Sequence, residues 1–426
     1  MARRILVTIC CATLLLTSAA DAETLTLREC LRMAATANPD LKVAAFDEKV
    51  AAEGIGAARS GYLPRLDFQG GYTVQKDPQS MIIQDMNMRM RTQQESYGHF
   101  TVAAEQTIYD FGRTSARFER SMALRDASSF SYTAREQDVF LQVVRAYYGV
   151  LEYERLLQSA EEEVVQMTDH MRVAKNLFQQ GVVTRNDLLQ AEVELAASRQ
   201  RRLIEANRVA NGRLYLNYLI GRPASFRVDL RDVSEGAAGA GKENSSGFDP
   251  DARAEVKAIK KGILADDLTV REMKSFYYPE LFARLGADYV QNDRVSEQAI
   301  LFAAVGLRVN LFDGLATTSR YRQAVQSRSR GEENLRTLKE QIRLEYDTAI
   351  NDLRIAAERI ETARTAVRQG EENLRINKDR YQEHVGTATD VIDAQTLLTK
   401  IRTEYYRAIF DYQVAVARIQ KAKGEL

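Results

Sequence analysis

The sequence predicts a mostly α fold with a small β part, built as two tandem repeats that each contain a long helical hairpin and two strands. All six prolines lie outside the segments 79–222 and 280–426, so both segments can run as uninterrupted helices. Short stretches that alternate apolar and polar residues stand before each segment or at its start, and these indicate strands. A twelve-residue turn motif also occurs twice, which indicates internal duplication.

The first 22 residues have the pattern of a secretory signal peptide. Arg3 and Arg4 precede an apolar run from Ile5 to Leu16, and Ala20-Asp21-Ala22 has the small-x-small form of a cleavage site. A retained membrane anchor is the alternative, but the apolar run is shorter than the roughly 20 residues that cross a bilayer. We therefore expect cleavage before Glu23 and export of the mature chain.

Composition and motifs exclude several function classes. The chain carries 59 basic and 59 acidic residues, whereas nucleic-acid binders usually show a basic field. Cys30 is the only cysteine after the signal segment, so no internal disulfide can form. There is no G-x-S-x-G, P-loop or metal-spaced cluster, and Arg59 stands where a dinucleotide motif needs its third glycine. We expect no enzyme activity, no cofactor and no metal site.

The order helix, strand, strand, long helix, turn, helix is written twice. A helical stretch from 40 to 62 ends at Tyr62-Leu63-Pro64, and a second stretch from 253 to 277 ends at Tyr277-Tyr278-Pro279. The boundaries expected from this repetition are 1–22 for the signal peptide, 23–221 for the first repeat, 222–250 for a linker, and 251–426 for the second repeat.

Apolar residues in the two long segments follow the spacing of a coiled coil. Their steps alternate between four and three residues, which places them along one side of a helix. We expect a helix over 113–178, a returning helix over 185–220, and a short helix over 27–37. The stripe residues are Phe140, Val143, Tyr147, Val150 and Leu157 in the first repeat, and Ala349, Leu353, Ala356, Ile360, Ala363, Val367, Gly370 and Leu374 in the second.

Four segments have the period-two alternation of strands with one apolar and one polar face. They are 66–75, a partner near 99–109, 281–289, and a partner near 301–312. Each has about ten residues, the length that crosses a membrane when tilted. A soluble antiparallel sheet that covers a core is the alternative. In lipid every strand edge must be paired, so two, three or four identical chains would have to combine their strands, for a total of 8, 12 or 16.

The ordered set of motifs resembles the TolC family of outer-membrane efflux and secretion ducts. It comprises the two Tyr-x-Pro motifs, Leu311-Phe312-Asp313-Gly314, Val385-Gly386-Thr387, and Asp390-Val-Ile-Asp-Ala394. The resemblance covers nearly all of the mature chain. It implies a homotrimer whose strands form one twelve-stranded β-barrel in outer-membrane lipid, continued by long helices into the periplasm.

The resemblance also implies a function and partners. Ducts of this family dock onto a periplasmic adaptor and an inner-membrane pump of RND or ABC type, and the pump supplies the energy. We expect a passive exit duct for small toxic compounds. A duct for type I protein secretion is one alternative. A periplasmic adaptor is another, although an adaptor would carry one hairpin flanked by lipoyl-like and small β-barrel modules.

The repeated turn motif occupies 181–192 and 384–395, and the resemblance makes these segments the two hairpin tips at the periplasmic entrance. Val182, Thr184, Asp187 and Ala191 recur 203 positions later as Val385, Thr387, Asp390 and Ala394. The residues expected to contact the adaptor are Gly181, Val182, Val183, Thr184, Val385, Gly386 and Thr387. Turn chemistry alone is an equal explanation for each of them.

Two carboxylates at the second tip are the candidate gate. Asp390 and Asp393 resemble the paired acidic residues that line the family's constriction, and Tyr381 matches their aromatic partner. In a trimer they would form rings that select cations. For Asp187 a helix N-cap is the preferred alternative to a gating role.

The second tip also departs from the family prototype. Gly386 replaces an arginine that bridges to the neighbouring hairpin, so we expect a different or weaker latch, to which His384 is a candidate contributor.

Overall fold

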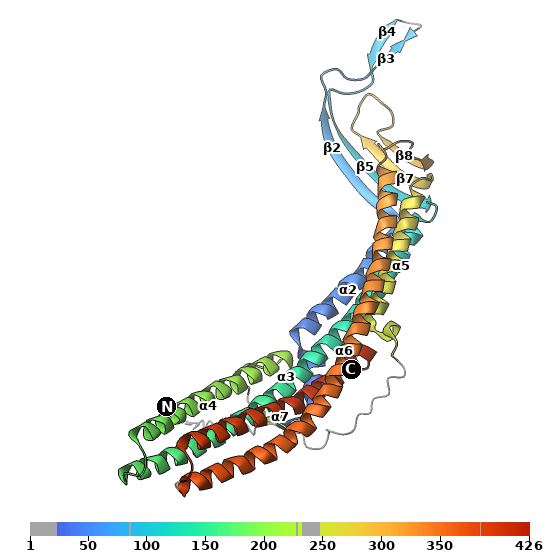
Figure 1. The fold of residues 1–426 in the computed structure, drawn as a ribbon. Helices are drawn as coiled ribbons and strands as arrows, with labels where there is room; N and C mark the ends of the chain where they lie inside the picture. Colours follow the sequence, from blue (N-terminus) through green and yellow to red (C-terminus); the bar gives the residue numbers. More distant parts are fainter. Residues whose placement is uncertain (1–23, 85–86, 227–228, 232–247, 384) are drawn as a thin grey trace, which may run out of the picture. The chain divides into compact units, whose positions relative to one another are not determined.

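The computed structural model describes residues 24–84, 87–226, 229–231, 248–383 and 385–426. Within them helices dominate and strands form a small part, which confirms the mostly α class (Figure 1). The predicted signal peptide and most of the predicted linker lie outside the described residues. No helix in the described ranges is both long enough and apolar enough to span a bilayer.

The chain divides into two compact units, and each unit draws on both sequence repeats. One unit, the hairpin unit, takes Met1–Asn38, Phe140–Lys242 and Asp352–Ala415. The other, the sheet unit, takes Pro39–Val139, Glu243–Asn351 and Val416–Leu426.

The sheet unit contains one four-stranded antiparallel sheet, with the order β2-β5-β7-β8. Its strands are β2 (Arg65–Val74), β5 (Ser96–Tyr109), β7 (Glu280–Val290) and β8 (Ala299–Arg308). All four predicted strands are therefore confirmed, and the two repeats meet at the β5–β7 pair. The outer strands β2 and β8 each have only one partner in the described chain.

One face of this sheet is apolar and exposed. The register pairs Phe68 with Val102 and Ala287 with Leu301, so apolar side chains of all four strands share that face. Leu301 is 84% exposed and Val305 is 75% exposed. A sheet that covers a core would bury these side chains, so this face of the sheet does not cover a core within the described chain.

The opposite face carries polar and charged pairs. The Thr101 hydroxyl donates to Asp288 Oδ1 at 2.7 Å, and Arg308 Nη2 lies 3.0 Å from Glu105 Oε1. The first contact links the neighbouring strands β5 and β7, and the second links β5 to β8, two strands away. Side chains of the polar face therefore connect three of the four strands.

Two shorter strand pairs were not expected from the sequence. β3 (Ser80–Ile83) and β4 (Met88–Arg91) form a separate antiparallel hairpin in the sheet unit. In the sequence this hairpin lies between β2 and β5. In the hairpin unit, β1 (Thr24–Leu25) pairs in parallel with β6 (Asp229–Leu230).

Helices of the sheet unit lead directly into and out of its strands. α2 (Pro39–Arg59) continues as the 3-10 helix η1 (Ser60–Tyr62) before β2, and η3 (Pro250–Ala252) precedes α5 (Ala254–Ser275) before β7. Asp110 ends the β5 segment and caps α3 (Arg113–Gln179), since its carboxylate accepts the Thr114 amide at 2.8 Å. Asp313 caps α6 (Ala316–Gln382) in the same way through Thr317, at 2.9 Å.

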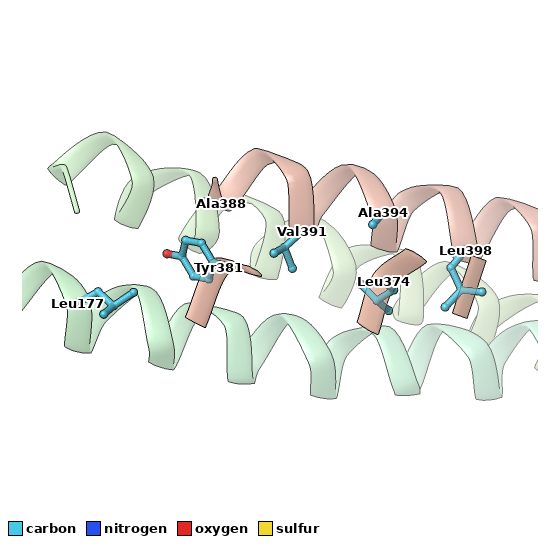
Figure 2. Close-up of a cluster of buried hydrophobic side chains, with 7 residues drawn as sticks. All are labelled: Leu177, Leu374, Tyr381, Ala388, Val391, Ala394 and Leu398. Atoms are coloured by element: carbon cyan, nitrogen blue, oxygen red, sulfur yellow. The ribbon is translucent and has the colours of Figure 1, made fainter. Parts of the chain in front are cut away.

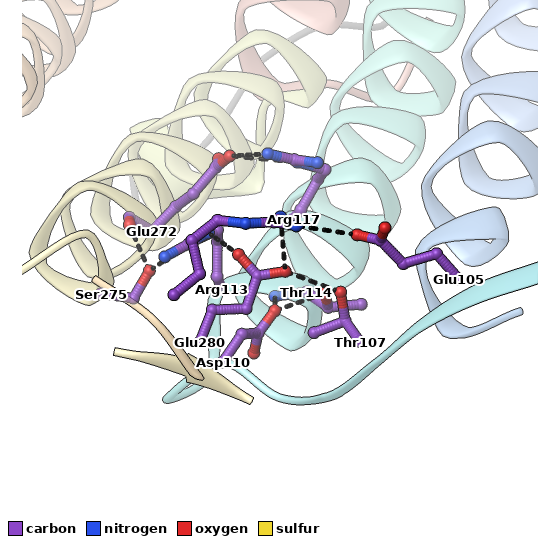
Figure 3. A network of polar contacts seen from close by, with 10 residues as sticks. Glu105, Thr107, Asp110, Arg113, Thr114, Arg117, Glu272, Ser275 and Glu280 are labelled. Atoms are coloured by element: carbon purple, nitrogen blue, oxygen red, sulfur yellow. Dashed lines mark hydrogen bonds and ion pairs between the residues drawn. The ribbon is translucent and has the colours of Figure 1, made fainter. Parts of the chain in front are cut away.

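An ion-pair network ties α3, α5, β5 and β7 together (Figure 3). Arg113 Nη1 lies 3.1 Å from Glu280 Oε2, and the Thr107 hydroxyl donates to the other Glu280 oxygen at 2.9 Å. One turn further along α3, Arg117 Nη2 lies 2.8 Å from Glu272, which is buried. Arg113, Glu280 and Glu272 at this strand–helix junction have little access to solvent, whereas Arg117 is half-exposed.

The hairpin unit is built from α1 (Leu27–Ala37), the later part of α3, α4 (Arg185–Leu219), the later part of α6, and most of α7 (Ala388–Lys423). The predicted bounds of the first three agree with the structure to within one residue. Most stripe residues are buried, although Phe140, Leu157 and Val367 are half-buried.

Cys30 lies on α1 and is fully buried. Burial raises the pKa of its thiol to about 12, so it is a small core residue without a reactive thiolate.

Candidate functional site

The first hairpin tip, between α3 and α4, is a left-handed turn that requires glycine. Gly181 has φ +74°, and its amide donates to the Phe178 carbonyl at 3.0 Å. The next amide, of Val182, reaches back to Leu177 at 2.9 Å. These bonds satisfy carbonyls at the end of α3 that would otherwise lack partners. Turn chemistry thus accounts for Gly181, while Val182 is exposed at the tip.

The second tip, between α6 and α7, closes on one carbonyl. The amides of Val385 and Gly386 both donate to the Arg380 carbonyl, at 2.9 and 3.1 Å. A Cβ at Gly386 would lie 3.1 Å from Arg380 Cβ and 3.3 Å from its carbonyl carbon. Glycine is favoured here by close approach, since this residue is not among those with positive φ. The candidate latch residue His384 lies outside the described residues.

Each returning helix begins with the same reciprocal cap. Asp187 Oδ2 accepts the Thr184 amide at 2.9 Å, and the Asp187 amide donates to Thr184 Oγ1 at 3.3 Å. Asp390 and Thr387 repeat this arrangement at 2.9 and 3.2 Å. The prediction that Asp187 is the N-cap is therefore wrong. Thr184 is the N-cap, and Asp187 completes a capping box from the third helical position.

Hydrogen bonds to the cap also keep Asp390 ionised. The Thr387 amide and then the Thr387 hydroxyl hold the pKa of this carboxyl below its ordinary value. Asp390 is therefore charged at neutral pH, but its charge is already engaged in starting α7.

Asp393 has no such structural task. It is exposed on α7 and makes no hydrogen bond or ion pair with a described residue. Its counterpart in the first repeat, 203 positions earlier, is the neutral Gln190. The duplicated cap accounts for one acidic residue at each tip, and Asp393 is the additional carboxylate that capping does not explain.

Tyr381 belongs to an apolar cluster at the end of the hairpins. Figure 2 shows this α6 residue packed with residues of α3 and α7, with its hydroxyl oxygen pointing away from Leu374. The cluster comprises Leu177, Leu374, Tyr381, Ala388, Val391, Ala394 and Leu398. Tyr381 is 5% exposed, and its hydroxyl has no hydrogen-bond partner among the described residues. Burial, followed by the charge of Asp187, raises the pKa of Tyr381. The structure thus brings Tyr381 near Asp187 without a hydrogen bond between them.

A histidine that sequence reasoning did not single out lies beside Tyr381. His170 on α3 is 6% exposed, and its ring centroid lies 5.1 Å from that of Tyr381. Both residues border a cavity of about 180 Å³, next to Lys378, whose Nζ donates to Gln166 Oε1 at 2.7 Å. No local pattern marks His170, because its neighbours come from the other repeat. Burial, and then the charge of Lys378, lowers the pKa of His170.

Acidification is expected to loosen this part of the hairpin unit. Because the pKa of His170 is lowered in the folded chain, the unfolded chain binds more protons once the pH falls below the ordinary value of about 6.5. The contribution is complete above that pH and is lost as the pH falls towards the lowered folded value. Asp169 and Arg172 on α3, Lys378 and Tyr381 on α6, and Asp187 on α4 are the titratable and charged groups nearby.

Hydrogen–deuterium exchange of peptides from the ends of α3 and α6 tests this expectation. Protection should fall between pH 7 and pH 5, after correction for the intrinsic pH dependence of exchange, and His170→Gln should remove most of that fall. His99→Gln, in the sheet unit, is the matched control. An equal loss of protection in the His170→Gln protein would contradict the assignment to this ring.

Comparison with known proteins decides the family. The model of the family described as "Outer membrane efflux protein" matches residues 30–222 and 257–425. The chain belongs to the outer membrane efflux protein family. It is accordingly an outer-membrane protein, and the interpretation as a periplasmic adaptor is set aside.

Relatives of this outer membrane efflux protein include both channel and secretion proteins. Outer membrane protein TolC of Vibrio cholerae is 22% identical over 418 residues, which cover 94% of this chain and 91% of TolC. Alkaline protease secretion protein AprF of Pseudomonas aeruginosa is 21% identical, over 76% of this chain and 69% of AprF. The solved CmeC outer membrane channel of Campylobacter jejuni shares the fold, with a TM-score of 0.79 and 16% identity over 94% of this chain and 85% of CmeC. These relatives fit the prediction that the chain is not an enzyme.

Proposed function

We propose that the protein is the passive exit duct of a tripartite efflux system that expels small toxic compounds across the outer membrane. The exposed apolar face of the four-stranded sheet carries this proposal. An open sheet with free edges at β2 and β8 cannot stay in lipid, where each unpaired backbone group costs several kcal/mol. Edge β8 of one copy would pair with edge β2 of the next, and three copies would close a twelve-stranded barrel.

The tandem repeats define how each protomer contributes to this duct. Repeats over 23–221 and 251–426, joined by the segment 222–250, would each supply two strands and one helical hairpin. The apolar face of the barrel would contact outer-membrane lipid, and the polar face with Asp288 and Glu105 would line the interior. The hairpins would extend the duct into the periplasm.

The hairpin tips are the proposed contact with the periplasmic adaptor. Val182 and Val385 are both exposed there, and neither side chain is part of a described core, so both are available for contact with a partner. Gly181, Val183, Thr184, Gly386 and Thr387 shape the two turns around them. The adaptor would connect the duct to an inner-membrane pump of RND or ABC type, which would supply the energy.

Asp390 and Asp393 are the proposed gate carboxylates. In a trimer they would place six acidic groups around the axis at the entrance. Tyr381 would support the gate through packing of the apolar cluster, since its hydroxyl makes no hydrogen bond to a described residue. Asp187 would act through its cap and its charge near Tyr381.

Type I protein secretion is a second candidate function. The similarity to AprF, whose name describes secretion of an alkaline protease, favours it. Deletion of the gene separates the two functions. Greater sensitivity to dyes, detergents or antibiotics supports efflux, whereas an unchanged profile with a missing exported protein supports secretion.

Assembly and conduction test the duct itself. The full chain, purified in mild detergent, is expected to sediment as a trimer and to conduct in planar lipid bilayers. Val305→Arg would place a charge on the lipid face, at a cost of about 2–4 kcal/mol near the midplane, and should abolish stable insertion. Ala304→Arg, one residue away on the polar face, should be tolerated. A compact, non-conducting single subunit would refute the proposal.

A further inference from the structure

The β3–β4 hairpin presents three methionines on one face. The register pairs Met81 with Met90 and Ile83 with Met88. Directly paired residues point to the same side of a sheet, as do residues two positions apart on one strand. Met81, Met88 and Met90 therefore share a face, and the hairpin is otherwise covered there only by Ile83.

These methionines are exposed, in contrast to methionines that fill a core. Met81, Met88 and Met90 are 53%, 48% and 45% exposed, whereas Met167 in α3 is 1% exposed. Cβ atoms of a direct cross-strand pair lie about 5 Å apart, and residues two apart on a strand are separated by about 7 Å. Methionine has three flexible side-chain torsions, so the three thioether sulfurs can reach a common point above the face.

Charged groups of the hairpin occupy the other face and are engaged. Arg89 Nε donates to Ser80 Oγ at 2.7 Å, and Arg91 Nη1 lies 3.1 Å from Glu95 Oε1. Among the described residues of the hairpin, the methionine face thus offers neutral sulfur donors without carboxylate or imidazole. Elsewhere in the described ranges, no group of three or more His, Cys, Asp or Glu residues could hold a metal ion.

We propose that Met81, Met88 and Met90 form a site for one soft monovalent metal ion, Cu(I) or Ag(I). Thioether sulfur is a soft ligand that selects such ions, while Mg²⁺, Ca²⁺ and Zn²⁺ prefer oxygen, imidazole or thiolate donors. Three neutral ligands on a hairpin give trigonal sulfur coordination. The inference stands on the strand register, the exposure and the donor chemistry, and it does not depend on the exit-duct proposal.

The hairpin also lies at a defined end of the sheet. β2 follows η1 directly and β5 leads directly towards α3, so the segment between them stands at the strand ends remote from these helices. The site would share no residue with the hairpin tips or with the gate carboxylates Asp390 and Asp393.

Silver binding to the full-length protein in detergent tests the site. Protein labelled with ¹³C in the methionine methyl groups is titrated with silver nitrate in chloride-free buffer, in a Cys30→Ala background that removes the only mature thiol. The methyl resonances of Met81, Met88 and Met90 are expected to shift together and to saturate at one ion per chain. Each single Met→Leu variant, which keeps the side-chain volume, should bind at least about tenfold more weakly, and the triple variant should lose the site.

Controls separate a built site from general thioether binding. Met122→Leu removes a partly exposed methionine of α3 and should leave silver binding unchanged. Cu(I) kept reduced by ascorbate should shift the same three resonances, and Zn²⁺ should shift none. Absence of saturation at micromolar silver, or equal shifts of methionines throughout the chain, would overturn the proposal.

Discussion

Replacing Asp393 with asparagine is expected to weaken the block of single-channel current by a trivalent cation at least about tenfold, or about 1.4 kcal/mol of binding free energy. Asp393 is exposed and has no partner among the described residues, so its charge is available to an ion in the pore. At an effective dielectric of about 20, two charges about 6 Å apart interact by roughly 3 kcal/mol. Planar-bilayer recordings with hexaamminecobalt(III) measure the change.

The first repeat offers matched controls for this prediction. Gln190→Asp adds the carboxylate that the first tip lacks and should strengthen block. Asp187→Asn disturbs a cap without touching the proposed rings and should leave block within about twofold. Asp390→Ala should cost about 0.5–2 kcal/mol of local helix stability as well, because it removes the reciprocal cap with Thr387. Unaltered block in the Asp393→Asn channel would remove Asp393 from the gate.

Replacing Arg113 with methionine is expected to lower the free energy of unfolding by about 3–5 kcal/mol. Arg113 and Glu280 are both mostly buried, so removal of the arginine leaves the carboxylate between α3 and β7 with only the Thr107 hydroxyl and the longer 3.9 Å pair with Arg308. The guanidinium also lies 4.1 Å from the centroid of the Phe276 ring, and that contact is lost too. Guanidinium unfolding in detergent, followed by far-UV circular dichroism, gives the midpoint and slope.

A surface pair and a double variant control the Arg113 measurement. Arg65 pairs with Asp67 at 2.9 Å where both side chains are exposed, so Arg65→Met should cost less than about 1 kcal/mol. Arg113→Met combined with Glu280→Met should recover much of the loss, because an apolar pair removes the buried unpaired charge. Equal costs for Arg65→Met and Arg113→Met would show that the junction network does not stabilise the protein.

Long elements could be predicted from the sequence because their physical signals are local. Absence of proline and a four-three apolar spacing placed α3 at 113–178, one residue short of its end. Alternation over about ten residues located β2 and β7. The β3–β4 hairpin was missed because each of its strands has only four residues, too few for the alternation to be recognised. The two-residue β1–β6 pair joins segments about 200 positions apart and leaves no pattern in either.

Only those features of the candidate site that depend on residues close together in the sequence could be predicted. The Thr-x-x-Asp spacing at 184–187 and 387–390 is a capping-box signature, but the sequence interpretation assigned the cap itself to Asp187. The burial of Tyr381 against Leu177, and its position beside His170, depend on packing between the two repeats. Side-chain neighbours across repeats cannot be derived from either segment alone.

The exposed face of the sheet also constrains how the protein is made. In the proposed duct, a newly exported subunit would carry that apolar surface and two unpaired strand edges through an aqueous compartment before it reached lipid, and such strands adhere readily to one another. Biogenesis would then require a chaperone that shields the strands, or a folding order in which they form only when the other subunits are present.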